Sequence, residues 1–206
     1  MIKNIIWDFD GVILDSMPVR EYGFREIFKN YDLELVEKLL EYHNENGGLS
    51  RYVKIKYFYE KLLKQSISND KIQELAENFS VIMRHELINN KYLILETLKF
   101  IKNNFKLYNF HIASGSDDLE LQYLCEKLEL SKYFHSINGS PVHKNILVQK
   151  ILESNSYNIN ETILIGDSIN DYEAAQKNGI SFYGFNNKSL IEYSKIYIED
   201  YEIINE

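Results

Sequence analysis

Four aspartates, arranged as two pairs at the ends of apolar segments, are the residues of this sequence best placed to do chemistry. Asp8 and Asp10 follow the apolar run Ile5–Trp7, and Gly11 comes directly after them. Side chains two apart on a strand project from the same face, so both carboxylates can face one site. Gly11 permits the sharp turn that has to follow. Two carboxylates here favour a hard cation such as Mg²⁺, although a solvated turn rich in Asp and Gly is the alternative.

The second pair has the same design. Asp167 and Asp171 follow the apolar run Ile163–Ile165, after Gly166. A helix that begins between the two acids would place them on one side. A capped helix start would explain one of these acids, but not both of them beside a matching N-terminal pair. The two pairs together predict one acidic site at the carboxyl ends of two buried strands.

A hydroxyl group and backbone amides follow a third apolar run. Ser114 ends the segment 110–113, and Gly115 and Ser116 come next. Amides and a hydroxyl at a strand end can hold phosphate oxygens, as a helix N-terminus does. The alternative is that Ser114 is the N-cap of the helix that begins at Asp117.

Lys144 stands just ahead of a predicted helix over residues 145–154, where a positive charge opposes the helix dipole. An unfavourable charge indicates a functional reason, although a lone lysine is usually solvated. We assign the neighbouring His143 to the surface.

The residues 5–16, IIWDFDGVILDS, closely resemble the first signature of the haloacid dehalogenase superfamily, whose members are mostly phosphatases. Ser114, Lys144 and the segment 166–171, GDSIND, match the second, third and fourth signatures in the same order. The resemblance extends from residue 1 to about residue 185, and the helical segment described below lies where the family's helical cap lies.

This resemblance implies a Mg²⁺-dependent phosphatase that hydrolyses a small phosphate monoester, a sugar phosphate or a phosphoglycolate-like compound. Asp8 would attack phosphorus to give an aspartyl phosphate, and Asp10 would serve as general acid and base. The expected site residues are Asp8, Asp10, Ser114 and Lys144 for catalysis, Asp8, Asp10 (by its main-chain carbonyl), Asp167 and Asp171 for the metal, and Ser114, Gly115 and Lys144 for phosphate.

Several other functions fit the sequence less well. A sugar phosphomutase shares the core and cap, but such mutases carry a His where Arg20 stands here. Dehalogenases and phosphonatases replace the second aspartate, so Asp10 favours phosphate chemistry. A signalling receiver domain also uses acids, a hydroxyl and a lysine, but it has an adjacent acid pair and no inserted cap. A catalytically inactive binding protein would have lost Asp8 or Asp10.

The pattern of elements predicts an α/β fold with a doubly wound parallel sheet and an inserted α-helical cap. From residue 92 onward strands and helices alternate, whereas residues 16–91 are helical in pattern. We therefore expect a Rossmann-like core of residues 1–15 and 92–206 and a cap of residues 16–91. The expected helices are 19–30, 33–45, 52–64, 70–89, 93–104, 119–128, 145–154 and 171–178, and the expected strands after the first are 108–113, 136–138, 162–165 and 181–185, with a last short helix and strand.

One stretch of the cap predicts a substrate contact. Gly47 and Gly48 form a flexible turn before Arg51, which resembles the substrate-specificity loop of capped members of the family. Arg51, assisted by Arg20, would bind the leaving group. A plain turn between two helices explains the same residues equally well.

Composition limits the partners. The chain has 206 residues, is 45% hydrophobic and carries a formal charge of −8, so we expect a sizeable core and neither a nucleic-acid nor a membrane partner. A single cysteine, Cys125, excludes an intrachain disulfide. The start of the chain lacks a signal-peptide pattern, and we expect a cytoplasmic monomer or homodimer that acts on a small phosphorylated metabolite.

Overall fold

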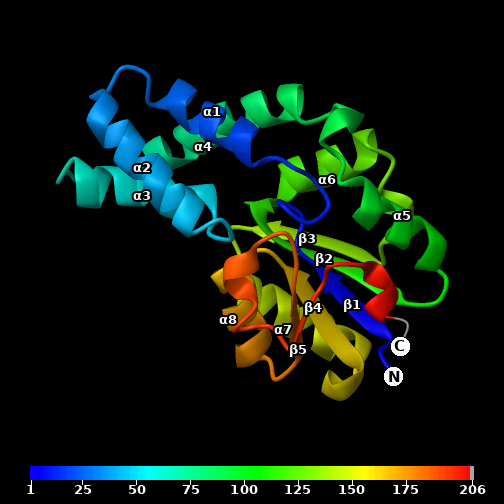
Figure 1. Ribbon diagram of the computed structural model, residues 1–206. Coiled ribbons are helices and arrows are strands. Elements are labelled where there is room, and N and C mark those ends of the chain that lie inside the picture. The colour runs from blue at the N-terminus through cyan, green and yellow to red at the C-terminus, as the bar shows by residue number, and fades with distance from the viewer. Residues whose placement is uncertain (205–206) are drawn as a thin grey trace.

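The fold is centred on a parallel β-sheet. The computed structural model describes residues 1–204, and within them six strands pair in the order β3-β2-β1-β4-β5-β6 (Figure 1). The chain reverses its direction of travel across the sheet between β1 and β4, which is the doubly wound arrangement predicted. The strands are β1 (Asn4–Trp7), β2 (Asn109–Asp117), β3 (Ser136–Ser140), β4 (Thr162–Gly166), β5 (Ser181–Gly184) and β6 (Ile196–Tyr197).

Helices cover both faces of the sheet, because successive side chains of a buried strand point to opposite faces. Ile6 of β1 belongs to a cluster with the apolar side chains of α7 and α8. Ile5 and Trp7 belong to the other cluster, with those of α5 and α6. These helices are α5 (Leu95–Asn104), α6 (Asp118–Lys127), α7 (Lys144–Asn155) and α8 (Ile169–Lys177).

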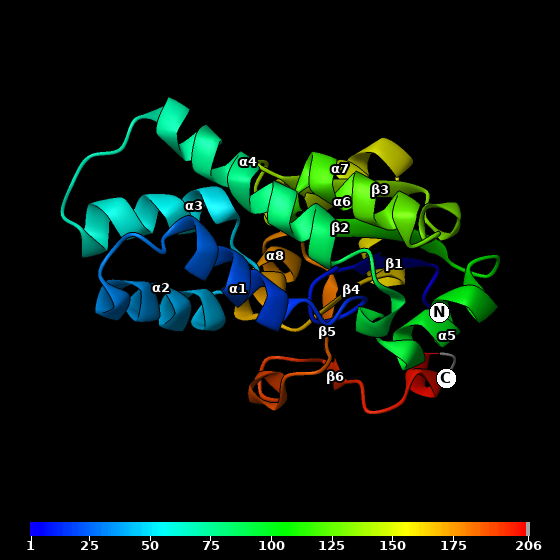
Figure 2. The ribbon, with the colours of Figure 1, turned by 90° about the horizontal axis from the view of Figure 1, so that it is seen from above.

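The remaining helices lie between β1 and α5 and form a separate group beyond the carboxyl end of β1 (Figures 1 and 2). We call this group the helical insertion. Its helices are α1 (Met17–Ile27), α2 (Leu33–Glu45), α3 (Arg51–Tyr57), which continues into a π-helical turn at Phe58–Leu62, and α4 (Asn69–Glu86). The α/β class with an inserted helical unit is thus confirmed.

Capping and periodicity explain the insertion helices. Asp32 accepts a hydrogen bond from the backbone N–H of Glu34 at 2.8 Å, and Ser68 accepts one from Lys71 at 3.2 Å, so both side chains satisfy a free donor of a first turn. The buried residues of α4 follow the spacing of one helical face. They are Ile72, Leu75, Ala76, Phe79, Ser80 and Met83.

The predicted end of the second strand was wrong. We expected the strand to stop at Ala113, but β2 continues to Asp117 because Asp117 pairs with Ser140 of β3 after a shift in register. Ser114 and Gly115 therefore lie within a strand and not in a loop. Elsewhere in residues 1–204, the α-helices and strands occur close to their predicted bounds, but the short 3₁₀ helices at Ser131–Tyr133 and Ile159–Glu161 were not predicted. No helix of these residues is long and apolar enough to span a membrane.

The insertion has an aromatic centre whose loss should be measurable. Phe28 is fully buried and stacks on Phe58 with 4.1 Å between ring centroids. We expect Phe28→Ala to lower the free energy of unfolding by about 3–5 kcal/mol, because a large buried ring leaves a cavity. Urea denaturation measures this change. Tyr22→Ala, at a ring 48% exposed on α1, is the control and should change it by less than about 0.5 kcal/mol. A loss below about 1 kcal/mol for Phe28→Ala would contradict this packing.

Candidate active site

Strand register brings the predicted site residues to one edge of the sheet. Trp7 of β1 lies beside Ile112 of β2 and Ile165 of β4. Asp8 is the next residue after Trp7, and Ser114 and Asp167 follow their partners by two positions. In a parallel sheet this edge, at the carboxyl ends of the strands, is where ligands bind.

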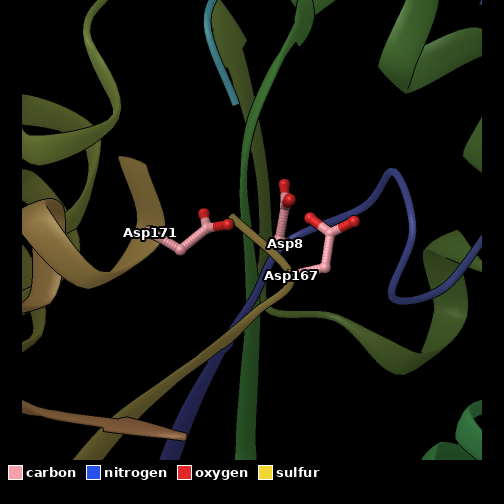
Figure 3. Close-up of side chains that lie close together, drawn as sticks. All are labelled: Asp8, Asp167 and Asp171. Carbon is pink, nitrogen blue, oxygen red and sulfur yellow. The ribbon is translucent and has the colours of Figure 1, made fainter. Parts of the chain in front are cut away.

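Three carboxylates gather at this edge. Oxygens of Asp8, Asp167 and Asp171 lie within 4.8 Å of one another. Figure 3 shows Asp8 from the end of β1, Asp167 from the loop after β4 and Asp171 from α8. Gly11 makes room for this cluster: its φ of +75° suits glycine, and a Cβ at this position would overlap the Asp167 carboxylate.

Lys144, the first residue of α7, inserts its ammonium group among these acids. Its Nζ lies 2.8 Å from Oδ1 of Asp8 and also donates to Oδ1 of Asp171. All three side chains are buried. The charges of Asp171 and Asp8 outweigh the effect of burial and raise the pKa of Lys144, so it stays protonated. The position that seemed unfavourable for a lysine at a helix start is explained by these two carboxylates.

The single positive charge of Lys144 does not neutralise the negative charges of the three aspartates. Burial and the charge of Asp171 raise the pKa of Asp8 to about 7, in spite of Lys144. Burial and the charge of Asp8 likewise raise the pKa of Asp167. Buried carboxylates that repel one another in this way would be stabilised by a further cation. Because all the donors are carboxylate oxygens, the cluster suits a hard divalent ion such as Mg²⁺.

Asp171 has a second task as part of the start of α8. Its Oδ2 accepts hydrogen bonds from the backbone N–H of Ser168 at 3.0 Å and from the Ser168 hydroxyl at 2.6 Å. Helix α8 begins at Ile169, between Asp167 and Asp171, and so slightly before the predicted start at residue 171. The capped helix start and the acidic site are therefore both present, and they share one side chain.

Asp10 faces a different set of partners. Its Oδ1 accepts from Arg20 Nε at 2.7 Å and from the Ser16 hydroxyl, and its Oδ2 accepts from the Ser116 hydroxyl at 2.5 Å. Burial alone would raise the pKa of Asp10, but the charge of Arg20 and the hydrogen bonds from Ser116 and Ser16 leave it below the ordinary value. The carboxylate is held ionised in this arrangement.

The predicted phosphate residues lie under the helical insertion. Ser114 is buried, and its hydroxyl accepts from the backbone N–H of Ser116 at 3.1 Å. The N-cap of α6 is Asp117 and not Ser114, since Asp117 accepts from the N–H of Glu120 at 3.2 Å. Gly115 is in such close contact with the carbonyl group of Gly48 that a Cβ would overlap it.

The two predicted arginines meet at an acid that the sequence reasoning missed. Glu120 of α6 is fully buried and accepts from Arg20 Nη1 at 3.2 Å and from Arg51 Nη1 at 2.6 Å. Arg51 also donates to Ser80 at 2.6 Å, and its guanidinium lies over the ring of Phe79. Arg51 therefore bridges the insertion and α6 across buried ion pairs, and its Nη1 is already occupied.

Other residues near Asp10 also escaped the sequence reasoning. The sequence analysis considered only the backbone amide of Ser116. Its hydroxyl, however, donates a hydrogen bond to Asp10 and accepts one from Arg20. Lys54 and His43 are buried in the insertion and bond each other at 2.8 Å. Glu120 resembled an ordinary acid in a first helical turn, which the helix dipole favours anyway. No motif singled out any of them.

Comparison with known proteins agrees with the four motifs. Residues 5–185 match the family model described as haloacid dehalogenase-like hydrolase. A relative from Thermotoga maritima, named phosphorylated carbohydrates phosphatase, is 26% identical over 219 positions that cover 99% of this chain and 97% of the relative.

Two solved structures share the fold at low sequence identity. A hydrolase from Pseudomonas syringae has a TM-score of 0.78 and 18% identity, over 98% of this chain and 96% of its own. A β-phosphoglucomutase from Clostridium difficile has a TM-score of 0.77 and 17% identity, over 100% and 96%. The predicted superfamily is confirmed, and with it an enzyme. On the family match across most of its length, the chain belongs to the haloacid dehalogenase-like hydrolases.

Proposed function

We propose that this enzyme is a Mg²⁺-dependent phosphatase that hydrolyses a small phosphorylated carbohydrate or a phosphoglycolate-like monoester through an aspartyl phosphate on Asp8. The observation that carries the proposal is the buried carboxylate of Asp8, 2.8 Å from the Lys144 ammonium and beside Asp167 and Asp171. The relative named phosphorylated carbohydrates phosphatase supports the substrate class.

In the proposed reaction, an oxygen of Asp8 forms a bond to phosphorus while the bond to the leaving alkoxide breaks. Lys144, the Ser114 hydroxyl and the backbone amide of Gly115 hold the phosphate oxygens. A bound Mg²⁺ would be held by Asp8, Asp167 and the main-chain carbonyl of Asp10, with Asp171 nearby, and would supply positive charge against the phosphate. Water then hydrolyses the aspartyl phosphate.

Asp10 has to exchange its present hydrogen-bond partners before it can act as the general acid of the proposed reaction. A general acid needs a proton to give to the leaving alkoxide, whereas Arg20 and Ser116 stabilise the ionised form of Asp10. We propose that substrate binding or movement of the insertion separates Asp10 from Arg20. The division into a core of residues 1–15 and 92–206 and a cap of residues 16–91 belongs to this proposal, as does a closing motion.

A sugar phosphomutase remains the second candidate, because the β-phosphoglucomutase has the same fold. Arg20 favours hydrolysis, because by the family resemblance such mutases carry a His at this position. Release of inorganic phosphate from a monophosphate substrate, without a bisphosphate activator, separates the two reactions.

The nucleophile gives the first test of this function. We expect Asp8→Asn to abolish phosphate release from the best substrate of a sugar phosphate and phosphoglycolate panel, because an amide is a poor nucleophile. Circular dichroism should show an unchanged fold. Asp15→Asn, which removes an exposed carboxylate from the same stretch, is the matched control and should keep wild-type kcat. Near-wild-type kcat in Asp8→Asn would refute the mechanism.

Metal identity gives a second test. Phosphate release should require Mg²⁺, and Ca²⁺ should inhibit it, because calcium accepts a larger and looser oxygen shell. The measurement is the initial rate after chelation and after addition of each ion. Full activity in a chelator, with negligible metal content, would exclude a metal-dependent site.

The raised pKa of Asp8 predicts a pH effect on the metal-free protein. With a pKa of about 7 folded and 3.8 unfolded, the folded state holds more protons between these values, so stability is lost as pH rises through the window. Asp8→Asn lacks this loss. The difference in melting temperature, Asp8→Asn minus wild type, should therefore be at least about 2–4 °C larger at pH 8 than at pH 5. This is the shift that about 1 kcal/mol gives in a chain of this size. A constant difference across this range would contradict the repulsion, and Mg²⁺ should reduce the gain.

A further inference from the structure

A small cavity beside Asp10 lies between the helical insertion and the sheet edge. It has a volume of about 20 Å³, enough for one water-sized group. Asp10, Gly115 and Ser116 line it from the core side, and Lys54 and His43 line it from the insertion. Because Asp10 and Gly115 adjoin the nucleophile and Ser114, the cavity begins where the leaving group of a phosphate ester would emerge.

The positive charges around this cavity are unequally compensated. Arg20 is paired with Asp10, and Glu120 pairs with both Arg20 and Arg51. Lys54 is only 2% exposed, and among the described residues no carboxylate oxygen lies within 4 Å of its Nζ. Its contacts are His43 Nδ1 at 2.8 Å and the carbonyl oxygen of Gly47 at 3.2 Å. A buried ammonium without an anion is costly.

The groups without partners at this cavity are donors. Lys54 has three N–H bonds and two acceptors, so one N–H is free. His43 Nδ1 accepts from Lys54, which places a proton on Nε2, and this atom is buried with no partner in the part of the chain described. Nη2 of Arg51 is likewise buried and has no hydrogen-bond partner among the described residues. A ligand that satisfies them has to accept hydrogen bonds, and an ionised carboxylate does so while also adding the negative charge that Lys54 lacks.

We infer that Lys54, positioned by His43, binds a carboxylate on the leaving group, so that the preferred substrates are phosphate esters of hydroxy acids. This inference rests on the proposed phosphatase function and narrows its substrate class. A carboxylate is smaller than a second phosphate group, which agrees with the small volume of the cavity. Burial and the charge of Arg20 lower the pKa of Lys54 to about 7 against the opposing charge of Asp10, so a bound anion would favour the protonated form of Lys54.

Equilibrium binding tests this inference without turnover. The probes are matched pairs of increasing length: 2-phosphoglycolate with ethyl phosphate, 3-phosphoglycerate with glycerol 3-phosphate, and 4-phosphoerythronate with erythritol 4-phosphate. Calorimetry on Asp8→Asn, which leaves each ester intact, should show about 10-fold or tighter binding of the carboxylate in at least one pair, the value of a charge-assisted hydrogen bond. Adding Lys54→Met should remove this preference.

The control is Lys56→Met in the same Asp8→Asn protein, because Lys56 is an exposed lysine on the same helix. It should retain the preference for the carboxylate. Equal affinity within every pair, no binding of any carboxylate probe, or a preference that survives Lys54→Met would each overturn the inference. Tighter binding of ethylene glycol bisphosphate than of any carboxylate probe would also overturn it, in favour of a second phosphate.

Failure of the proposed function would be visible separately. Wild-type enzyme that releases no phosphate from any member of the pairs or of the wider panel would refute the phosphatase, whatever the binding ratios. Phosphate release at equal kcat/KM within every pair would leave the phosphatase standing and refute the role of Lys54. The expected result is a kcat/KM ratio in favour of the carboxylate that falls about 10-fold in Lys54→Met and stays unchanged in Lys56→Met.

Discussion

The ionic contact of Lys144 with Asp8 and Asp171 is the interaction on which the rest of the site depends. It joins the end of β1 to the starts of α7 and α8. Buried ions are tolerated only with close, well-directed partners, so this contact fixes the three elements relative to one another. The remaining negative charge, centred on Asp8 and Asp167, is what a divalent cation would neutralise. The arrangement that holds Asp8, the proposed nucleophile, is thus also the arrangement that favours a metal.

A second ionic network attaches the helical insertion to the core. Glu120 accepts from both Arg20 and Arg51, and Arg20 continues to Asp10. Tyr52 adds a hydrogen bond to Asp117 at 2.6 Å. Because one guanidinium binds both Glu120 and Asp10, the position of the insertion and the protonation of Asp10 are linked. A change that withdraws Arg20 would free Asp10 to take up a proton and would weaken the attachment of the insertion at the same time.

Much of this architecture could be predicted from the sequence, because the fold and the acidic site both depend on short-range patterns. Apolar runs followed by Asp8 and Asp167 place an acid at the end of each of two strands. Because β1 and β4 pair in parallel, these two strand ends lie side by side. The length of β2 could not be predicted, since it depends on pairing between Asp117 and Ser140 across a register shift. The partners of Arg20 and Arg51 were out of reach for the same reason: Glu120 is distant in the sequence and has no motif of its own.

Helical spacing nevertheless carries a signal that motif reasoning passed over. The buried residues of α3 and its π-helical extension include Arg51, Lys54, Ile55 and Phe58, which recur at the three- and four-residue steps of one face. Lys56 lies off this face and is exposed. Two basic residues on a buried face either find an anion or tend to lose their charge, since an unpaired buried charge is costly. Arg51 finds Glu120 within the protein, whereas Lys54 has no carboxylate among the described residues. A basic residue on the buried face of a helix therefore indicates an acid elsewhere in the fold, as for Arg51, or a group with a lowered pKa that an anionic ligand would return to its charged form, as proposed for Lys54.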